Sequence, residues 1–336
     1  MQRHGFVGAA AAAAIVTFAV GAHGAEYEWT WQSYWQPGTV NQKAFQQFAE
    51  DVERRSDGRI VIEALPVDAV VPPGEVLDAV GANILQGSNG GIGYYVGKDP
   101  AFALLADFNA GYENPQQFTD WFYEGGGNEL ARELYERYNV YFIGPAIWGA
   151  ESIPSRVPLR SIEDFDGLKM RAPEGMGAAI WGKLGVGVST LPGTEVYTAL
   201  ERGYIDATDW GTLGMNDELG YGDIAPYATY PGIHSMPAND IAINLDIWNS
   251  LPDDLKQVLQ EAAIEFNQNS IRMTKELDES FAKQRDPETL IDWSPEERRE
   301  LREVAREVWE EWAGRSEMAQ KIYDSHIAFM KERGLL

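Results

Sequence analysis

Residues 167–210 read GLKMRAPEGMGAAIWGKLGVGVSTLPGTEVYTALERGYIDATDW and contain two kinds of periodicity. The segment 168–171 predicts a strand, and 175–184 and 194–201 predict helices. A second segment, 205–210, predicts another strand. Strands that alternate with helices in this way indicate an α/β fold.

The same alternation extends toward the N-terminus. Residues 27–35 predict a strand, and 41–56 have apolar residues at helical spacing. Residues 59–65 and 140–147 predict two further strands. The α/β prediction therefore applies to most of the chain and not to one motif.

The last third of the sequence is predicted to be helical. Residues 253–281 and 295–330 are long and charged, and Val304, Val308 and Trp312 recur at helical spacing. Such an apolar face is buried against another surface. We expect the C-terminal helices to pack on the body of the protein or on a partner subunit.

The composition excludes several classes of function. The chain has 27 basic and 52 acidic residues and a formal net charge of −25. A negative field of this size repels nucleic acid and anionic lipid, and any site for an anion needs its own positive charge. The chain has no cysteine, which excludes disulfides, thiolate metal sites, a cysteine nucleophile and a lipidated N-terminal cysteine.

The N-terminus has the features of a cleavable secretory signal. A basic head, Met1–His4, precedes the apolar run Gly8–Val20, and small residues follow at Ala22 and Gly24. We expect residues 1–25 to be a signal peptide, cleaved after Gly24 or Ala25, and the mature chain to be periplasmic. A retained membrane anchor is the alternative, but the run is shorter than the about 20 residues of a spanning helix.

Catalytic signatures are weak in this sequence. His234 and His326 are the two histidines after cleavage; neither follows a G-x-S-x-G motif, and no H-x-x-x-H spacing occurs. We expect His326 to lie on the surface of a charged helix. Gly87–Gly93 lacks a phosphate-binding pattern and predicts a tight turn beside a cleft. No spacing selects a pair of catalytic carboxylates, so we predict that the protein is not an enzyme.

A series of motifs resembles the DctP-type solute-binding proteins of TRAP transporters. The series is GLKMRAP (167–173), KLG (183–185), LPGTEVY (191–197) and ALERGYIDATDW (199–210). With APY (225–227), YPG (230–232) and YYVGKDP (94–100), it is most similar to the branch that binds 2-oxo acids or lactate, often with a metal ion. The motifs occur in order over nearly the whole mature chain.

The resemblance implies a periplasmic-binding-protein-like fold with two α/β lobes, hinge strands, a long connecting helix and long C-terminal helices. It implies lobe I at 26–150, to which part of 236–285 returns, and lobe II at 151–235. Residues 286–336 are then the C-terminal helices, through which some relatives form homodimers.

The resemblance also implies the ligand groups. Arg171 matches the arginine that grips the substrate carboxylate, and a guanidinium suits that role because its two parallel N–H groups fit a carboxylate. Asp209 and the carbonyl of Trp210 match positions that bind a cation together with the substrate, which suits Na⁺ or Ca²⁺. Without a cation, Asp209 would accept a hydrogen bond from a substrate hydroxyl or bind an ammonium group.

Two positions depart from the family pattern. Ser235 stands where the branch has a metal-ligating glutamate, and Ala150 where it has a glutamine. Glu151 and His234, each next to one of these positions, are candidate replacements. Ser235 is also a candidate contact for the ligand.

Aromatic residues complete the predicted pocket. Tyr94 and Tyr95 are placed there by the resemblance, and Trp148 by its position after the 140–147 strand. Phenol hydroxyls would bond the ligand while the rings exclude water; an ordinary aromatic core is the alternative. Asp240 is a weaker candidate, because it precedes a predicted strand and would serve there as a cap.

The predicted function is therefore capture of a small organic acid, a 2-oxo or 2-hydroxy monocarboxylate, and its delivery to a TRAP membrane permease. No cofactor is required, and the resemblance allows for Na⁺ or Ca²⁺ bound with the substrate. The alternatives are a binding protein for an aromatic or sugar acid and an exported carboxylate-based hydrolase.

Overall fold

The structure, a computed structural model, describes residues 24–191 and 193–336. The predicted signal peptide therefore lies almost entirely outside the described residues. Among those that are described, no helix combines the length and the apolarity needed to cross a membrane.

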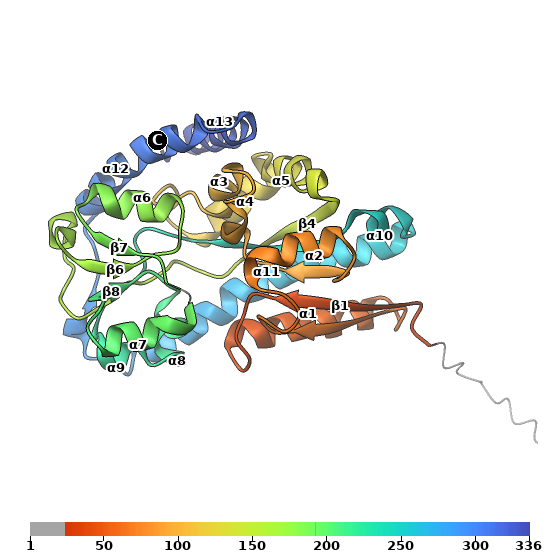
Figure 1. Ribbon diagram of the computed structural model, residues 1–336, viewed down its shortest axis with the longest axis horizontal. Coiled ribbons are helices and arrows are strands. Elements are labelled where there is room, and N and C mark those ends of the chain that lie inside the picture. Colours follow the sequence, from red (N-terminus) through yellow and green to blue (C-terminus); the bar gives the residue numbers. More distant parts are fainter. Residues whose placement is uncertain (1–23, 192) are drawn as a thin grey trace, which may run out of the picture.

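Two separate sheets organise the molecule, at opposite sides of Figure 1. The first has the strand order β2-β1-β3-β10-β4. Its strands are β1 (Tyr27–Ser33), β2 (Ile60–Leu65), β3 (Gly87–Asn89), β4 (Val140–Ile147) and β10 (Ala238–Asn244). β1 is parallel to β2 and β3, whereas β10 is antiparallel to β3 and β4.

The second sheet has the order β11-β9-β5-β8-β6-β7. Its strands are short: β5 (Pro154–Ser155), β6 (Lys169–Arg171), β7 (Gly187–Ser189), β8 (Ala207–Thr208), β9 (Tyr227–Thr229) and β11 (Leu290–Ile291). The strand predicted over 205–210 is thus only two residues long, because the chain leaves the sheet at Asp209.

Helices cover both sheets. In the N-terminal half they are α1 (Val40–Arg55), α2 (Val76–Gly81), α3 (Ala101–Ala106), α4 (Pro115–Glu124) and α5 (Gly127–Tyr135). Around the second sheet they are α6 (Met176–Lys183), α7 (Val196–Glu201), α8 (Leu213–Glu218) and α9 (Tyr221–Ile224). The C-terminal ones are α10 (Leu245–Ser250), α11 (Asp253–Ala282), α12 (Pro295–Ala313) and α13 (Glu317–Glu332).

Two chain crossings and one long helix connect the sheets. The chain leaves the first sheet after β4, enters the second at β5, and returns from β9 to β10. The crossings touch, since Glu151 N–H donates to the carbonyl of Ser235 at 2.8 Å. α11 packs on α1 and β4 at one end and on α8 at the other (Figure 1).

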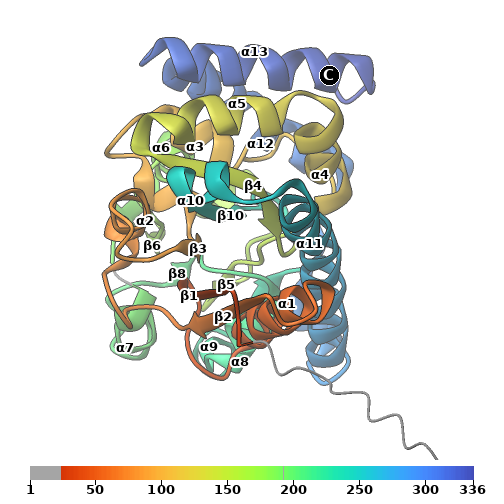
Figure 2. The same cartoon turned by 90° about the vertical axis from the view of Figure 1, so that its right-hand side faces the viewer.

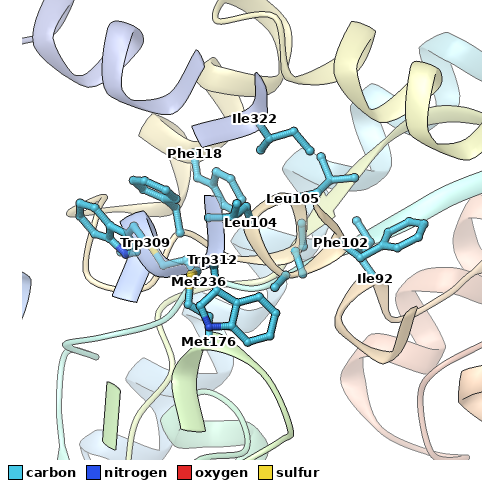
Figure 3. Close-up of a cluster of buried hydrophobic side chains, with 14 of the residues drawn as sticks. Ile92, Phe102, Leu104, Leu105, Phe118, Met176, Met236, Trp309, Trp312 and Ile322 are labelled. Carbon is cyan, nitrogen blue, oxygen red and sulfur yellow. The ribbon is translucent and has the colours of Figure 1, made fainter. Parts of the chain in front are cut away.

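The C-terminal helices lie across both halves. α12 contacts α6 and α3, and α13 contacts α3 and α5; Figure 2 shows α13 above α5. Figure 3 shows how Trp309 and Trp312 of α12 gather with Leu104 of α3 and Met176 of α6 in one buried cluster. The long pattern over 295–330 is interrupted where Ser316 caps α13 by accepting a hydrogen bond from Ala319 N–H.

His326 corrects one prediction, because it is fully buried and not on the surface. It shares the apolar face of α13 with Ile322 and Phe329 and stacks on Trp121 with ring centroids 3.6 Å apart. Its Nε2–H donates to the carbonyl of Leu104 at 3.0 Å. The prediction was wrong because it rested on the charged residues of this helix, although His326 itself lies on the buried side of an amphipathic helix.

Candidate functional site

A cavity of about 600 Å³ opens between the two sheets. Its lining comes from the first sheet and its loops, from the second sheet and its loops, and from both crossings. The polar and aromatic lining residues used below are Tyr34, Tyr94, Asp107, Trp148, Glu151, Arg171, Asp209, Trp210 and Ser235. The volume suits a small molecule.

Arg171 ends β6 with its side chain buried against the cavity. Its Nε donates to the carbonyl of Leu191 at 3.1 Å and one terminal nitrogen to the carbonyl of Asp209 at 2.5 Å. The ring of Trp210 lies 5.1 Å from the guanidinium carbon. Within residues 24–191 and 193–336, no carboxylate forms an ion pair with Arg171, so backbone carbonyls orient the cation without neutralising it.

A compact group of ionisable side chains lies beside this arginine. His234 Nε2 is 3.2 Å from Asp209 Oδ1 and 3.7 Å from Glu151 Oε2, and all three residues are buried. The other oxygen of Asp209 accepts a hydrogen bond from Trp181 Nε1 at 3.1 Å. The group combines one residue from each crossing with Asp209, which directly follows β8.

The two carboxyl groups have opposite pKa shifts. Burial raises the pKa of Glu151 well above its usual value, and the charge of Asp209 raises it further. Burial also acts to raise the pKa of Asp209, but His234 and the Trp181 hydrogen bond outweigh it and leave that pKa below its usual value. Asp209 is therefore the ionised member of the pair.

Asp107 is a cavity residue that the sequence did not reveal. Its Oδ2 accepts hydrogen bonds from Ser235 Oγ and Asn109 Nδ2, both at 2.5 Å, and its Oδ1 accepts one from Met236 N–H at 3.3 Å. Burial raises its pKa to about 7. The one signal in the sequence was an acid directly after the apolar run 101–106.

Aromatic residues also line the cavity. The hydroxyls of Tyr34 and Tyr94 lie 3.2 Å apart, and Trp148 packs edge-on against Trp35 with ring centroids separated by 4.8 Å. Tyr94 and Trp148 thus line the cavity, as predicted. Tyr34 was missed, although it belongs to the predicted 27–35 segment, because alternation alone does not say which strand end borders a cavity.

Tyr95 and Asp240 lie elsewhere, and the expectation that Tyr95 lines the pocket is corrected. Tyr95 is fully buried and packs on Phe102, with ring centroids 5.4 Å apart. Asp240 accepts hydrogen bonds from Ser88 Oγ and Gly90 N–H, both at 2.8 Å. The helical turn at Ile92–Tyr95 sends neighbouring tyrosines in different directions.

The residues present offer a different cation site from the one expected of the family. Ala150 has no donor atom, and Ser235 Oγ is engaged by Asp107. Glu151, Asp209 and His234 instead bring one ligand atom each to within 4.8 Å of one another. The candidate ligands next to the two altered positions are thus brought together with Asp209.

Known proteins resemble this chain over most of its length. Residues 32–315 match the family described as "Bacterial extracellular solute-binding protein, family 7" (DctP). A monocarboxylate 2-oxoacid-binding periplasmic protein of Nostoc is 31% identical over 288 residues, which are 84% of this chain and 79% of that protein.

Solved structures share the fold. A TRAP periplasmic solute-binding protein of Rhodobacter sphaeroides in an apo open state has a TM-score of 0.78 and 37% identity, covering 92% of this chain and 99% of that one. Another, from Pseudoalteromonas atlantica with bound sodium and pyruvate, has a TM-score of 0.77 and 26% identity, covering 91% and 94%.

Proposed function

Because the chain belongs to the bacterial extracellular solute-binding proteins of family 7, the DctP family, we propose that it captures a small 2-oxo or 2-hydroxy monocarboxylate in the cavity between its lobes. Export by the predicted signal peptide at residues 1–25 would place it in the periplasm. There it hands the acid to the membrane subunits of a TRAP transporter, without changing it chemically.

The observation that carries this proposal is that Arg171 is buried and forms no ion pair with a carboxylate of the described residues. A buried guanidinium is costly unless an anion compensates it, and here only carbonyls and an aromatic ring hold it. In a chain of net charge −25, this residue supplies the cavity with its positive charge. A ligand carboxylate is the anion that completes the site, and it binds a planar guanidinium through two parallel hydrogen bonds.

The rest of the cavity supports a short ligand with a second polar group. Glu151, Asp209 and the hydroxyls of Tyr34 and Tyr94 line the same cavity as Arg171. They are the polar groups available to an oxo or hydroxyl oxygen next to a carboxylate held by Arg171. The lobes then close as a hinge over the acid.

The test is a thermal-shift screen of the mature protein against oxo, hydroxy, aromatic and sugar acids. Each acid is run with sodium, with calcium and with chelator. A ligand at 100 times its dissociation constant stabilises the native state by about 2.7 kcal/mol. We expect monocarboxylates to raise the melting temperature of the wild type.

Three variants assign that response to Arg171. In Arg171→Ala we expect affinity to fall at least about 30-fold, since truncating one partner of a buried charge pair costs about 2–5 kcal/mol. Arg171→Lys should lose most of the affinity, because an ammonium cannot form the bidentate pair. Arg272→Ala, on the exposed face of α11, is the matched control. An undiminished response in Arg171→Ala would overturn the proposed site.

A further inference from the structure

We propose that Glu151, Asp209 and His234 hold a divalent transition-metal ion such as Zn²⁺ or Co²⁺ in the wall of the cavity. The inference rests on the proposed function for the role of the ion, which is to bind the captured acid, but not for the binding of the ion itself. The site has one nitrogen and two oxygen ligands, whereas the family resemblance implies a site for Na⁺ or Ca²⁺.

The spacing of the three ligand atoms fits coordination. His234 Nε2 lies 3.2 Å from Asp209 Oδ1 and 3.7 Å from Glu151 Oε2. Nitrogen and oxygen ligands lie about 2.0–2.2 Å from such an ion, which separates neighbouring ligand atoms by roughly 3.0–3.6 Å. Small side-chain rotations therefore suffice to seat the ion.

The side chain of His234 lies beside two carboxylates but makes no hydrogen bond in the described part of the chain. The residue is 3% exposed, and neither ring nitrogen has a hydrogen-bond partner there, since its approach to Asp209 lacks hydrogen-bond geometry. Buried polar atoms are nearly always bonded, and orphaned ones indicate an absent ligand or ion. Nε2 lies close to both carboxylates, and a cation bound between the three groups would satisfy all of them.

The surroundings prepare Asp209 for this role. Trp181 Nε1 donates to Asp209 Oδ2 at 3.1 Å, which fixes the carboxylate with Oδ1 toward His234. The Trp181 ring also packs edge-on against the imidazole, with centroids 5.0 Å apart. Outer groups that orient metal ligands in this way are a regular part of metal sites.

The mixed donor set decides the kind of ion. Calcium and magnesium favour sites built from oxygen alone, whereas imidazole with carboxylates suits zinc and its first-row neighbours. Three protein ligands also leave coordination positions open toward the cavity, which Glu151 and Asp209 line. An acid held by Arg171 can occupy them, because Arg171 already bonds the main chain of Asp209.

Cobalt is the probe for the test, because Co²⁺ reports its ligands through visible absorption. Tag-free mature protein is stripped with chelator, dialysed, and titrated with Co²⁺ in the absence of any acid. We expect one ion per chain, visible bands, and displacement by Zn²⁺ but not by Ca²⁺ or Na⁺. His234→Gln, Glu151→Gln and Asp209→Asn should each weaken binding at least about 10–100-fold.

Two controls match the altered groups. His326→Gln changes the other described histidine, and Glu303→Gln changes an exposed carboxylate of α12; both should bind cobalt like the wild type. Absence of bound cobalt, or binding that His234→Gln leaves unchanged, would overturn the metal site. Acid binding that persists in chelator would then leave the proposed function standing, whereas cobalt binding without any acid response would support the metal site alone.

Discussion

At the cavity, the position of the Trp210 ring depends on the small size of Gly193. The Trp210 ring covers the guanidinium of Arg171, and a β-carbon added to Gly193 would lie 2.0 Å from the Trp210 ring. No real contact is that short, so glycine at 193 leaves the space that the indole occupies beside the arginine. The position of the Trp210 ring therefore depends on the residue at 193.

Gly193→Ala tests this dependence. The added methyl group must push Trp210 off Arg171 or shift the loop, so we expect ligand affinity to fall about tenfold and stability by about 1–3 kcal/mol. Affinity is measured by calorimetry and stability by denaturant unfolding. Gly182→Ala is the control, because a β-carbon there meets no atom within 4 Å and lies in α6. Unchanged affinity in Gly193→Ala would contradict the steric account.

At the scale of elements, α11 secures the segment that follows the site. Asp278 on α11 accepts hydrogen bonds on one oxygen from Thr212 Oγ at 2.6 Å and from Gly214 N–H at 2.7 Å. These donors start α8, which begins three residues after Trp210. A carboxylate at a helix N-terminus stabilises the unpaired N–H groups there. The long helix thus holds the chain on which Asp209 and Trp210 lie.

Two substitutions of Asp278 separate the contribution of its hydrogen bonds from that of its charge. Asp278→Ala removes both hydrogen bonds and should cost about 1–3 kcal/mol of unfolding free energy, with a smaller loss of ligand affinity. Asp278→Asn keeps an oxygen in place and should retain most of the stability. Both are measured by urea unfolding and calorimetry. If Asn were as damaging as Ala, the oxygen acceptor would not be the stabilising feature.

Secondary structure was predicted well where neighbours in sequence determine it. The strand over 140–147 and the helix from 253 have their predicted positions, with α11 ending one residue later. Short elements were predicted less well, since β8 has two residues of a predicted six. A two-residue strand carries no periodicity, and only its partners in the sheet define it.

At the scale of the whole molecule, His326 links the C-terminal helix to the body and makes stability depend on pH. The Leu104 carbonyl can only accept, so Nε2 carries the proton and Nδ1 accepts from the Tyr112 hydroxyl at 2.8 Å. Burial lowers the pKa of His326 from 6.5 to about 3. The unfolded chain therefore binds a proton at pH values where the native protein does not.

It follows that His326 contributes stability above pH 6.5 that is lost progressively as the pH falls toward 3. One such group changes the unfolding free energy by up to about 1.4 kcal/mol per pH unit. In His326→Gln we expect lower stability at pH 7.5 and a shallower fall between pH 6 and 4, measured by urea unfolding at each pH relative to the wild type. Parallel pH profiles would show that another group is responsible.

The α/β architecture and the two-lobed fold could be predicted from periodicity and the ordered motifs, and the related structures confirm both. Helical and strand periodicity are local, and the ordered motifs are a property of the chain, so neither needs coordinates. The motifs also indicated Arg171, whose role as the carboxylate anchor stays a prediction.

Which side chains share the cavity depends on how the two sheets and the crossings pack. Tyr34, Asp107 and Asp209 come from segments far apart in the chain, and their places around one cavity depend on the crossings between the sheets. Tyr95 is adjacent to Tyr94 yet lies in the core. Burial and contact of this kind depend on how elements pack, and periodicity along one element carries no information about its neighbours in space.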